Sequence, residues 1–156
     1  MNQEKDESWM RKALSLARQA GSLGEVPVGA VVTFQGQLVG WGVNTRESNR
    51  TPLGHAELMA IRKASAVLGR WRLWGCTMYV TLEPCPMCAG AIVHARFPRV
   101  VFGALDPRTG ACGSVMNLVQ HEALNHRVEL ISEILSDESS LMIRQFFSEL
   151  RRRRSK

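Results

Sequence analysis

The stretch TMYVTLEPCPMCAGAIVHAR, residues 77–96, decides the fold. Its first part, residues 77–82, predicts a strand that is buried in the sheet. Pro84 then predicts a helix over residues 84–96, because proline is tolerated in the first turn of a helix, and Pro98 marks its end. A buried strand that passes directly into a helix is typical of an α/β fold.

Outward from this stretch, helical and strand patterns continue in alternation. Gln35-Gly36 separates two apolar runs and predicts a hairpin, and Ser136 is expected to cap the last helix. The expected helices cover residues 6–20, 55–68, 84–96, 117–122 and 136–150, the expected strands residues 28–34, 38–43, 77–82, 99–103 and 127–131, and the expected loops residues 44–54 and 106–113. This order predicts a three-layer α/β/α sandwich around a central mixed five-stranded sheet. Sites in such folds lie beyond strand ends, where helices begin.

Length and composition fit one compact domain. The chain has 156 residues, 45% of them hydrophobic, which is enough to fill a core. This excludes a disordered chain, a collagen-like chain and a small disulfide scaffold, and no apolar run reaches membrane-spanning length. The N-terminal residues MNQEKDESWMRK lack the apolar core of a signal peptide. We therefore expect a cytoplasmic protein with one domain over residues 1–150 and a basic tail over residues 151–156.

The positive charge is concentrated at the C-terminus. The formal net charge is +6, and five positive charges lie in the final RRRRSK, so the rest of the chain is close to +1. Arginine outnumbers lysine by 16 to 4. Because arginine binds phosphates in a bidentate manner and stacks on bases, this bias favours a nucleic-acid partner. A solvated, frayed tail is the alternative.

Two motifs at expected helix starts carry metal chemistry. One is His55-Ala56-Glu57, and the other is Pro84-Cys85-Pro86-Met87-Cys88. Cys85 and Cys88 are three residues apart, so their sulfurs lie on one side of the first turn, where free N–H groups and the helix dipole favour thiolates. Two thiolates and one imidazole are ordinary zinc ligands, and three protein ligands indicate an open, catalytic zinc site.

A closed structural site with a fourth ligand is the main alternative. His94 lies nine residues after Cys85, about 180° round the helix, and so should face away. His121 and His126 are expected at the surface or in packing, and Cys76 and Cys112 in packing, although spacing alone does not exclude the two cysteines. A redox CxxC is a further alternative, but it leaves the His-x-Glu motif without a role.

The presence of Glu57 favours a catalytic zinc site over a structural one. A carboxylate beside a zinc-activated water can take a proton from that water and deliver it elsewhere. The alternative is a glutamate that only stabilises the helix dipole from the first turn. Its place between the candidate ligands favours the proton shuttle.

The motifs HAE (55–57) and PCPMC (84–88) resemble those of the zinc-dependent cytidine and deoxycytidylate deaminase superfamily. Longer stretches are similar to its branch of bacterial tRNA-specific adenosine deaminases. These are EVPVGAVV (25–32), GHAELMAIR (54–62), MYVTLEPCPMCAGAIVHAR (78–96), VVFGALDPRTGACGS (100–114), NHRVE (125–129) and the Phe146-Phe147 pair before the terminal arginines. The resemblance covers nearly the whole chain and implies the cytidine deaminase-like form of the predicted fold.

The resemblance also implies a reaction. One Zn²⁺ per subunit, held by His55, Cys85 and Cys88, activates a water, and Glu57 carries the proton to N1 of the purine. Attack at C6 releases ammonia and converts adenosine to inosine at the wobble position, nucleotide 34, of the tRNA anticodon loop. The family forms homodimers in which the RNA site draws on both subunits, and no organic cofactor is expected.

Substrate-binding positions follow from the same resemblance. Asn44 matches an asparagine that hydrogen-bonds the nucleoside, and Asp106 lies in a loop that contacts a nucleotide. The others are Pro27 and Val28 as apolar pocket wall, and Phe147 and Arg151 as holders of flanking anticodon bases. Without the resemblance, Asn44 and Asp106 are typical turn residues, and Pro27, Val28 and Phe147 typical packing residues.

Two other classes of function remain open at this point. A deaminase of free nucleosides or bases would share both motifs without needing the basic C-terminus, so activity on an anticodon stem-loop discriminates it. A zinc-stabilised RNA-binding module would keep the metal ligands but not depend on Glu57.

Overall fold

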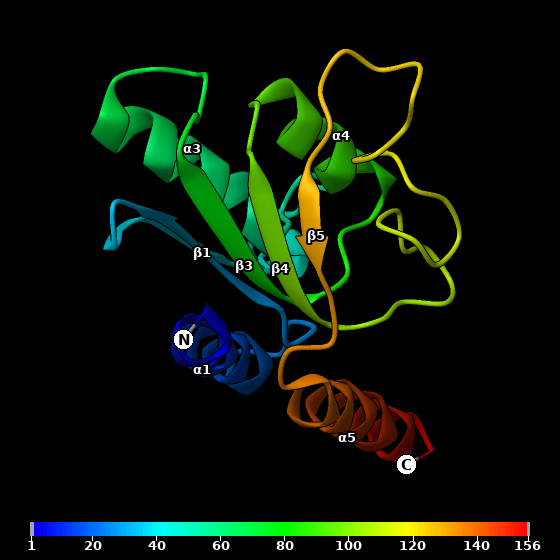
Figure 1. Cartoon of the computed structure of the whole chain (residues 1–156). Helices are drawn as coiled ribbons and strands as arrows, with labels where there is room; N and C mark the ends of the chain where they lie inside the picture. Colours follow the sequence, from blue (N-terminus) through cyan, green and yellow to red (C-terminus); the bar gives the residue numbers. More distant parts are fainter. Residues whose placement is uncertain (1, 156) are drawn as a thin grey trace.

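The structure, a computed structural model, describes residues 2–155 and is a sheet with helices on both faces (Figure 1). Its elements are α1 (Asn2–Ser22), β1 (Gly29–Phe34), β2 (Gln37–Val43), α2 (Arg46–Asn49), α3 (Ala56–Leu68), β3 (Cys76–Leu82), α4 (Pro86–His94), β4 (Arg99–Ala104), β5 (Glu129–Ile131) and α5 (Ser136–Arg154). No helix within residues 2–155 has the length and apolar character that crossing a membrane requires.

The sheet is mixed and has five strands in the order β2-β1-β3-β4-β5 across the described residues. The β1 strand runs antiparallel to β2 and β3, whereas β3, β4 and β5 run parallel. Leu82 pairs with Ala104 where β3 and β4 end. The chain segments that follow these two strands therefore leave the sheet side by side, and the first of them holds the PCPMC motif. The predicted sandwich and mixed sheet are confirmed.

Two separate cores hold the layers together. On one face, Val31 and Tyr79 pack with α1 and α5, and on the other, Val32 and Val80 pack with α3 and α4. Successive strand residues point to opposite faces, so each strand supplies both cores. Figure 1 shows α3 and α4 above the sheet and α1 and α5 below it.

Close contact between β2 and α3 positions His55, a residue of one candidate metal-binding motif. A Cβ atom at Gly42 would lie 2.2 Å from the carbonyl oxygen of Ala56, so only glycine allows the helix backbone this near the strand. Ala56 is the first residue of α3, directly after His55. The start of α3 is therefore fixed against the sheet, next to the strand ends.

The helix after β3 is shorter than predicted at both ends. It begins at Pro86 rather than Pro84, because Cys85 precedes a proline and adopts an extended conformation, with ψ of 173°. It ends at His94 rather than at about Arg96, whose φ of 65° is left-handed. Cys85 is consequently the N-cap residue of α4 and not part of its first turn.

Three further expectations about local structure are wrong. Ser136 is not the cap of α5, because Leu135, packed against the α1 and α5 core, occupies the N-cap position. Residues 117–122 form no helix: Asn117 pairs with Cys112 in an isolated β-bridge, and its side chain accepts a hydrogen bond from the backbone N–H of Gln120, which competes with helix formation. The last helix continues through Arg154 instead of ending near Leu150, because helix-forming arginines extend it.

Candidate metal centre and substrate cavity

Two helix N-termini bring the candidate metal ligands together. His55 is the N-cap residue of α3 and Cys85 that of α4. The Nδ1 atom of His55 lies 3.6 Å from Sγ of Cys85 and 3.4 Å from Sγ of Cys88. The three ligand atoms are within 4.8 Å of one another, and they are the only such cluster among residues 2–155. One imidazole nitrogen and two sulfurs at this spacing are a donor set that fits zinc.

The sulfur of Cys85 lies in an environment that favours its anionic form. Hydrogen bonding from the Cys88 side chain, with smaller contributions from His55 and the Cys88 backbone, lowers the pKa of Cys85 despite its partial burial. Because metals bind thiolates rather than thiols, this polarisation suits a metal ligand.

Glu57 lies beside this cluster but does not belong to it. Its side chain is buried, with 4% exposure, in the first turn of α3. Burial is the main cause that raises the pKa of Glu57 to about 7; the nearby Cys85 sulfur adds to the rise, and a backbone hydrogen bond and His55 oppose it. Glu57 is thus a carboxyl group next to the metal cluster that is free for a role other than ligation.

The other cysteines and histidines do not complete a four-ligand site. Cys76 and Cys112 are buried and lie outside the cluster, as does His94, which is exposed at the end of α4. The Nε2 atom of His126 lies 2.6 Å from the backbone carbonyl oxygen of Phe97. Within residues 2–155 the donor set therefore holds three protein ligands, which leaves a coordination position open to water or substrate.

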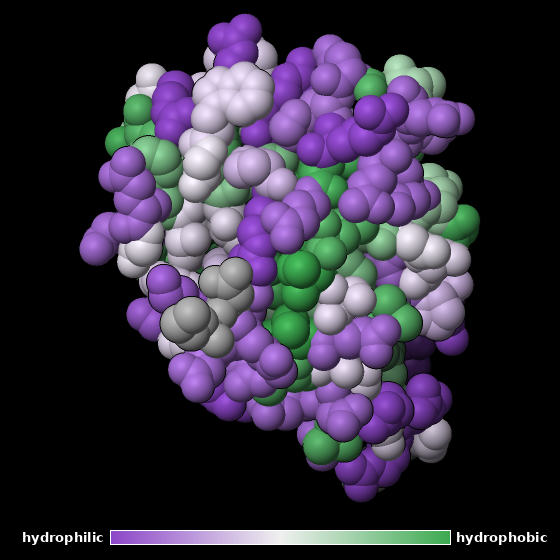
Figure 2. Space-filling model, in the orientation of Figure 1, coloured by the Kyte–Doolittle hydropathy of each residue, from purple (hydrophilic) through white to green (hydrophobic). Residues whose placement is uncertain are grey.

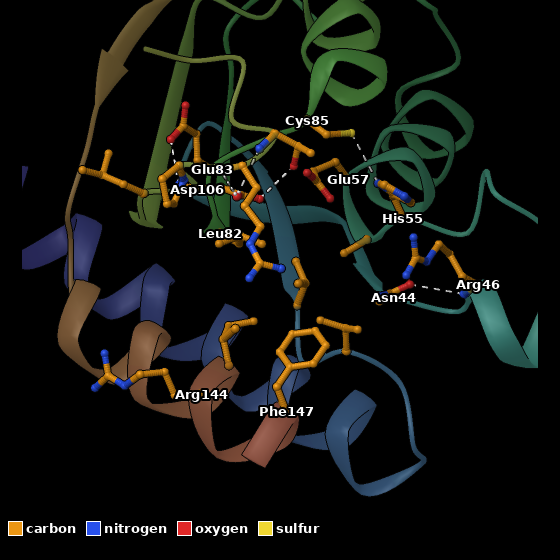
Figure 3. Close-up of a pocket in the computed structure, with 18 of the residues that line it drawn as sticks. Asn44, Arg46, His55, Glu57, Leu82, Glu83, Cys85, Asp106, Arg144 and Phe147 are labelled. Atoms are coloured by element: carbon orange, nitrogen blue, oxygen red, sulfur yellow. Dashed lines mark hydrogen bonds between the residues drawn. The ribbon is translucent and has the colours of Figure 1, made fainter. Parts of the chain in front are cut away.

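The metal cluster lies at one side of a cavity of about 810 Å³ (Figure 3). Its wall comes from the segment before β1, the residues after β2, the start of α3, the end of β3, the loop after β4 and one side of α5. The lining residues are Val26, Val28, Asn44, Arg46, His55, Ala56, Glu57, Leu82, Glu83, Cys85, Leu105, Asp106, Pro107, Arg108, Thr109, Ile143, Arg144, Phe147, Ser148 and Arg151. A cavity of this size can hold a nucleoside and part of its neighbours.

Most of the predicted substrate-binding residues lie on this cavity. Asn44 is buried at the cavity lining, and its Oδ1 accepts a hydrogen bond from the backbone N–H of Arg46. Val28 lines the cavity wall. Pro27 is buried but is absent from the lining, and its ring packs towards Gly21 instead.

Asp106 both lines the cavity and stabilises its own turn. Its carboxylate accepts the backbone N–H groups of Arg108 and Thr109 and the Thr109 hydroxyl. Asp106 is therefore a turn residue, as its sequence context indicates, and it also lies on the same cavity as the other candidate residues.

The C-terminal helix closes the cavity opposite the metal cluster. Phe147 is partly exposed on the cavity side of α5, stacked edge-to-face against Phe146. Arg151, one turn later, lines the cavity too. In Figure 3 the labelled Phe147 extends from α5 into the cavity, across from His55 and Cys85, whereas the Arg144 side chain points away from them.

Several cavity residues were missed from the sequence. Arg46, Arg108 and Arg144 are exposed at the cavity and, with Arg151, add four basic residues to a lining that also holds Glu57, Glu83 and Asp106. The excess of arginine over lysine was the only sequence signal for these residues, and composition does not predict which arginines lie on the same surface.

Two buried glutamates were also missed, and each supports one wall of the cavity. Glu25 accepts the backbone N–H groups of Glu47 and Ser48 and the Ser48 hydroxyl, so it holds the short helix α2 in place. Burial alone would raise the pKa of Glu25, but the Ser48 and Glu47 hydrogen bonds outweigh it and lower that pKa. Glu83 makes similar contacts to the loop after β4. Neither has a local sequence signal, because the partners lie more than 20 residues away.

Comparisons with known proteins agree with this geometry. Residues 4–151 match the model of the MafB19-like deaminase family. The tRNA-specific adenosine deaminase of Bacillus subtilis is 47% identical over 149 residues, which span 96% of this chain and 92% of that protein. The protein of the same name from Haemophilus influenzae is 44% identical over 95% of this chain and 86% of its own. A solved structure from work on A-to-I editing by tRNA:A34 deaminases at the wobble position of transfer RNA superposes with a TM-score of 0.83, at 38% identity over 86% of this chain and 98% of that one.

Proposed function

This chain belongs to the MafB19-like deaminases and, among them, to the tRNA-specific adenosine deaminases, and we propose that it converts adenosine to inosine at nucleotide 34 of a tRNA anticodon loop. The observation that carries the proposal is the His55, Cys85 and Cys88 cluster with Glu57 beside it on a cavity that also has basic walls. The reaction is hydrolytic: water adds at C6 of the purine, the bond from C6 to the exocyclic nitrogen breaks, and ammonia leaves.

We propose that the cluster binds one Zn²⁺ per subunit through Nδ1 of His55 and the sulfurs of Cys85 and Cys88. Bound zinc supplies Lewis-acid activation of a water molecule at its open position. The protein residues hold the thiolates at the start of α4, where helix N–H groups stabilise negative charge.

Glu57 is proposed as the proton carrier. Its carboxylate accepts a proton from the attacking water and delivers it to N1 of the base, and the proton of the new C6 hydroxyl group then goes to the departing amino group, which leaves as ammonia. The buried position of Glu57 supports this role, because the same group must be shielded from bulk water and remain near the reacting atoms.

Substrate contacts are proposed along the cavity. Asn44 donates a hydrogen bond from its NH₂ group to the nucleoside, and Val28 forms apolar wall, with Pro27 supporting it from behind. Asp106, which lies in the loop after β4, contacts a nucleotide of the RNA. On α5, Phe147 offers a stacking face and Arg151 a charged group to the bases and phosphates that flank the target.

The substrate class can be tested by competition between RNA and free compounds. We expect purified, zinc-loaded protein to form inosine in an anticodon stem-loop and to leave free adenosine, cytidine and guanine unchanged under the same conditions, because the exposed arginines of the cavity bind phosphates that free compounds lack. Mass spectrometry of the products makes the comparison. Turnover of a free nucleoside or base without inosine in the stem-loop would instead support the second class of deaminase.

We propose that the protein acts in the cytoplasm as a homodimer, with a catalytic domain over residues 1–150 and a basic segment over residues 151–156. Large apolar side chains are exposed on the surface, and an interface between two subunits would bury such groups. Among them are Trp71, Trp74, Val115 and Met116.

The basic end of α5 is expected to strengthen RNA binding through phosphate contacts. Hydrophilic residues cover most of this end, at the lower right of Figure 2. Glu149 pairs with Arg152 and Arg153, whereas Arg151 lines the cavity. Truncation after Leu150 should flatten the slope of log affinity against log salt concentration by about 0.7 for each phosphate that the shortened protein no longer neutralises.

Fluorescence anisotropy with a labelled stem-loop across a salt series measures this slope. The double substitution of Arg151 and Arg154 by glutamine is the matched variant, because it removes charge while keeping the helix at full length. An unchanged slope in both variants would mean that these arginines are solvated and do not touch RNA.

A further inference from the structure

Glu83 is a buried carboxylate that the proposed reaction does not use. It follows β3 directly, precedes the metal-ligand residue Cys85 by two positions, and has 2% exposure. A carboxylate this buried is costly unless hydrogen bonds satisfy it. Its partners therefore indicate what it does.

All of the hydrogen-bond partners of the Glu83 carboxylate lie in the loop after β4. Oε1 accepts the backbone N–H of Asp106 at 3.0 Å and the hydroxyl of Ser114. Oε2 accepts the backbone N–H groups of Cys112 and Ser114, both at 3.0 Å. One side chain thus holds both ends of the segment 106–114, and Figure 3 shows Glu83 beside Asp106 at the cavity.

The loop closes tightly around this carboxylate. A Cβ atom at Gly110 would lie 2.4 Å from the Glu83 carboxyl carbon and 2.4 Å from Oε2, so a side chain at position 110 has no space. Backbone bonds reinforce the arrangement, from the N–H of Ala111 to the carbonyl of Pro84 and from the N–H of Glu83 to the carbonyl of Ala104. The Glu83 side chain is therefore enclosed by the loop that it holds.

The held loop is one wall of the substrate cavity. Residues 105–109 line the cavity, and Glu83 and Cys85 line it from the adjoining strand end. The wall and the metal ligand are therefore fixed to the same short segment, 83–85. Loss of the Glu83 carboxylate would therefore loosen the 105–109 loop without removing any of the candidate metal ligands.

We propose that Glu83 is a positioning residue that sets the 105–109 wall at the distance from the metal cluster where the target base fits. This inference rests on the proposed deamination of RNA. The loop must be ordered before a base can be held, so loosening it should weaken substrate binding more than it slows the chemical step. Misplacement of about 1 Å in an enzyme site can lower the rate about 100-fold, which sets the upper end of the expected loss.

The test is steady-state kinetics on an anticodon stem-loop for the Glu83→Ala and Glu83→Gln variants. We expect Glu83→Ala to lower kcat/KM by about 10- to 100-fold, mainly through KM, with the zinc content of the protein unchanged. Glu83→Gln keeps the size of the side chain and one oxygen acceptor, so it should lie between the wild type and Glu83→Ala. Glu122→Ala, at an exposed glutamate outside the loop contacts, is the control that should match the wild type.

Two further measurements keep the inference testable if Glu83→Ala does not fold. Ser114→Ala removes only the hydroxyl that Glu83 accepts, and should raise KM in the same direction by a smaller factor. Amide hydrogen exchange of Asp106, Cys112 and Ser114 should accelerate in the Glu83 variants, because their N–H groups no longer have the carboxylate as acceptor.

The outcomes separate this inference from the proposed function. An unmodified stem-loop with wild-type protein contradicts the proposed function, and hydrogen exchange then still tests whether Glu83 holds the loop. An active wild type with unchanged KM in Glu83→Ala and Ser114→Ala overturns the inference. A loss confined to kcat, together with loss of zinc, also overturns it, since Glu83 would then support Cys85 instead of the cavity wall.

Discussion

Replacing Glu57 with glutamine is expected to lower the rate of inosine formation by about 100- to 10,000-fold while leaving zinc bound and the chain folded. Glutamine has nearly the same size, so the buried position in the first turn of α3 is kept. The glutamine amide, however, cannot accept the proton of the attacking water and deliver it to the base. The expected loss therefore falls on the chemical step.

Single-turnover rates on an anticodon stem-loop, with metal analysis of the same samples, measure this effect. Glu57 is not a member of the ligand cluster, so zinc content should equal that of the wild type. The Glu122→Gln variant controls for loss of a glutamate elsewhere on the chain. Inosine formed at the wild-type rate by Glu57→Gln would remove Glu57 from the mechanism, and it would favour a proton acceptor that lies elsewhere on the cavity.

Replacing Cys88 with alanine is expected to remove both zinc and activity. Cys88 is fully buried, and its sulfur lies 3.4 Å from Nδ1 of His55, so two ligands alone would remain. A zinc site with two protein ligands binds the metal weakly, because structural and catalytic sites use at least three. Zinc per chain should fall from about one to near zero, and the melting temperature should lose its dependence on added zinc, because a bound metal stabilises the folded state.

Cys76→Ala and Cys112→Ala are the matched controls, since both thiols are buried and both lie outside the ligand cluster. We expect each to keep zinc and activity. Loss of zinc in either variant would contradict the three-ligand arrangement and support the closed, structural site that the sequence leaves open.

The metal centre was predictable because its residues fall into two short sequence motifs, although the motifs themselves lie 30 residues apart. Cys85 and Cys88 have a spacing that predicts neighbouring sulfurs, and His55 with Glu57 forms a second short motif at a helix start. Sequence spacing did not predict that the first ligand of each motif, His55 or Cys85, is the N-cap residue of its helix. Pro86 decides this at Cys85, since a residue before proline is held extended and cannot enter the helix.

The walls of the cavity were less predictable, because they depend on contacts between distant segments. Glu25 organises α2 from 22 residues away, and the polar sequence of 44–54 gives no sign of that short helix. The residues around Glu83 indicate only a polar residue at the end of a strand, because its hydrogen-bond partners lie 23 to 31 residues later in the chain. The position of α5 beside the cavity depends on the fold of the whole sheet and not on local sequence. Phe147 and Arg151 were therefore predicted only from the family resemblance.

The most direct test of the account is the position of inosine in a defined RNA. An anticodon stem-loop with adenosine at nucleotide 34 and a second adenosine elsewhere in the loop is incubated with purified, zinc-loaded protein, digested with a nuclease and analysed by mass spectrometry. We predict inosine at nucleotide 34 and unmodified adenosine at the second position. A stem-loop without inosine after incubation with protein that holds its zinc would contradict the account.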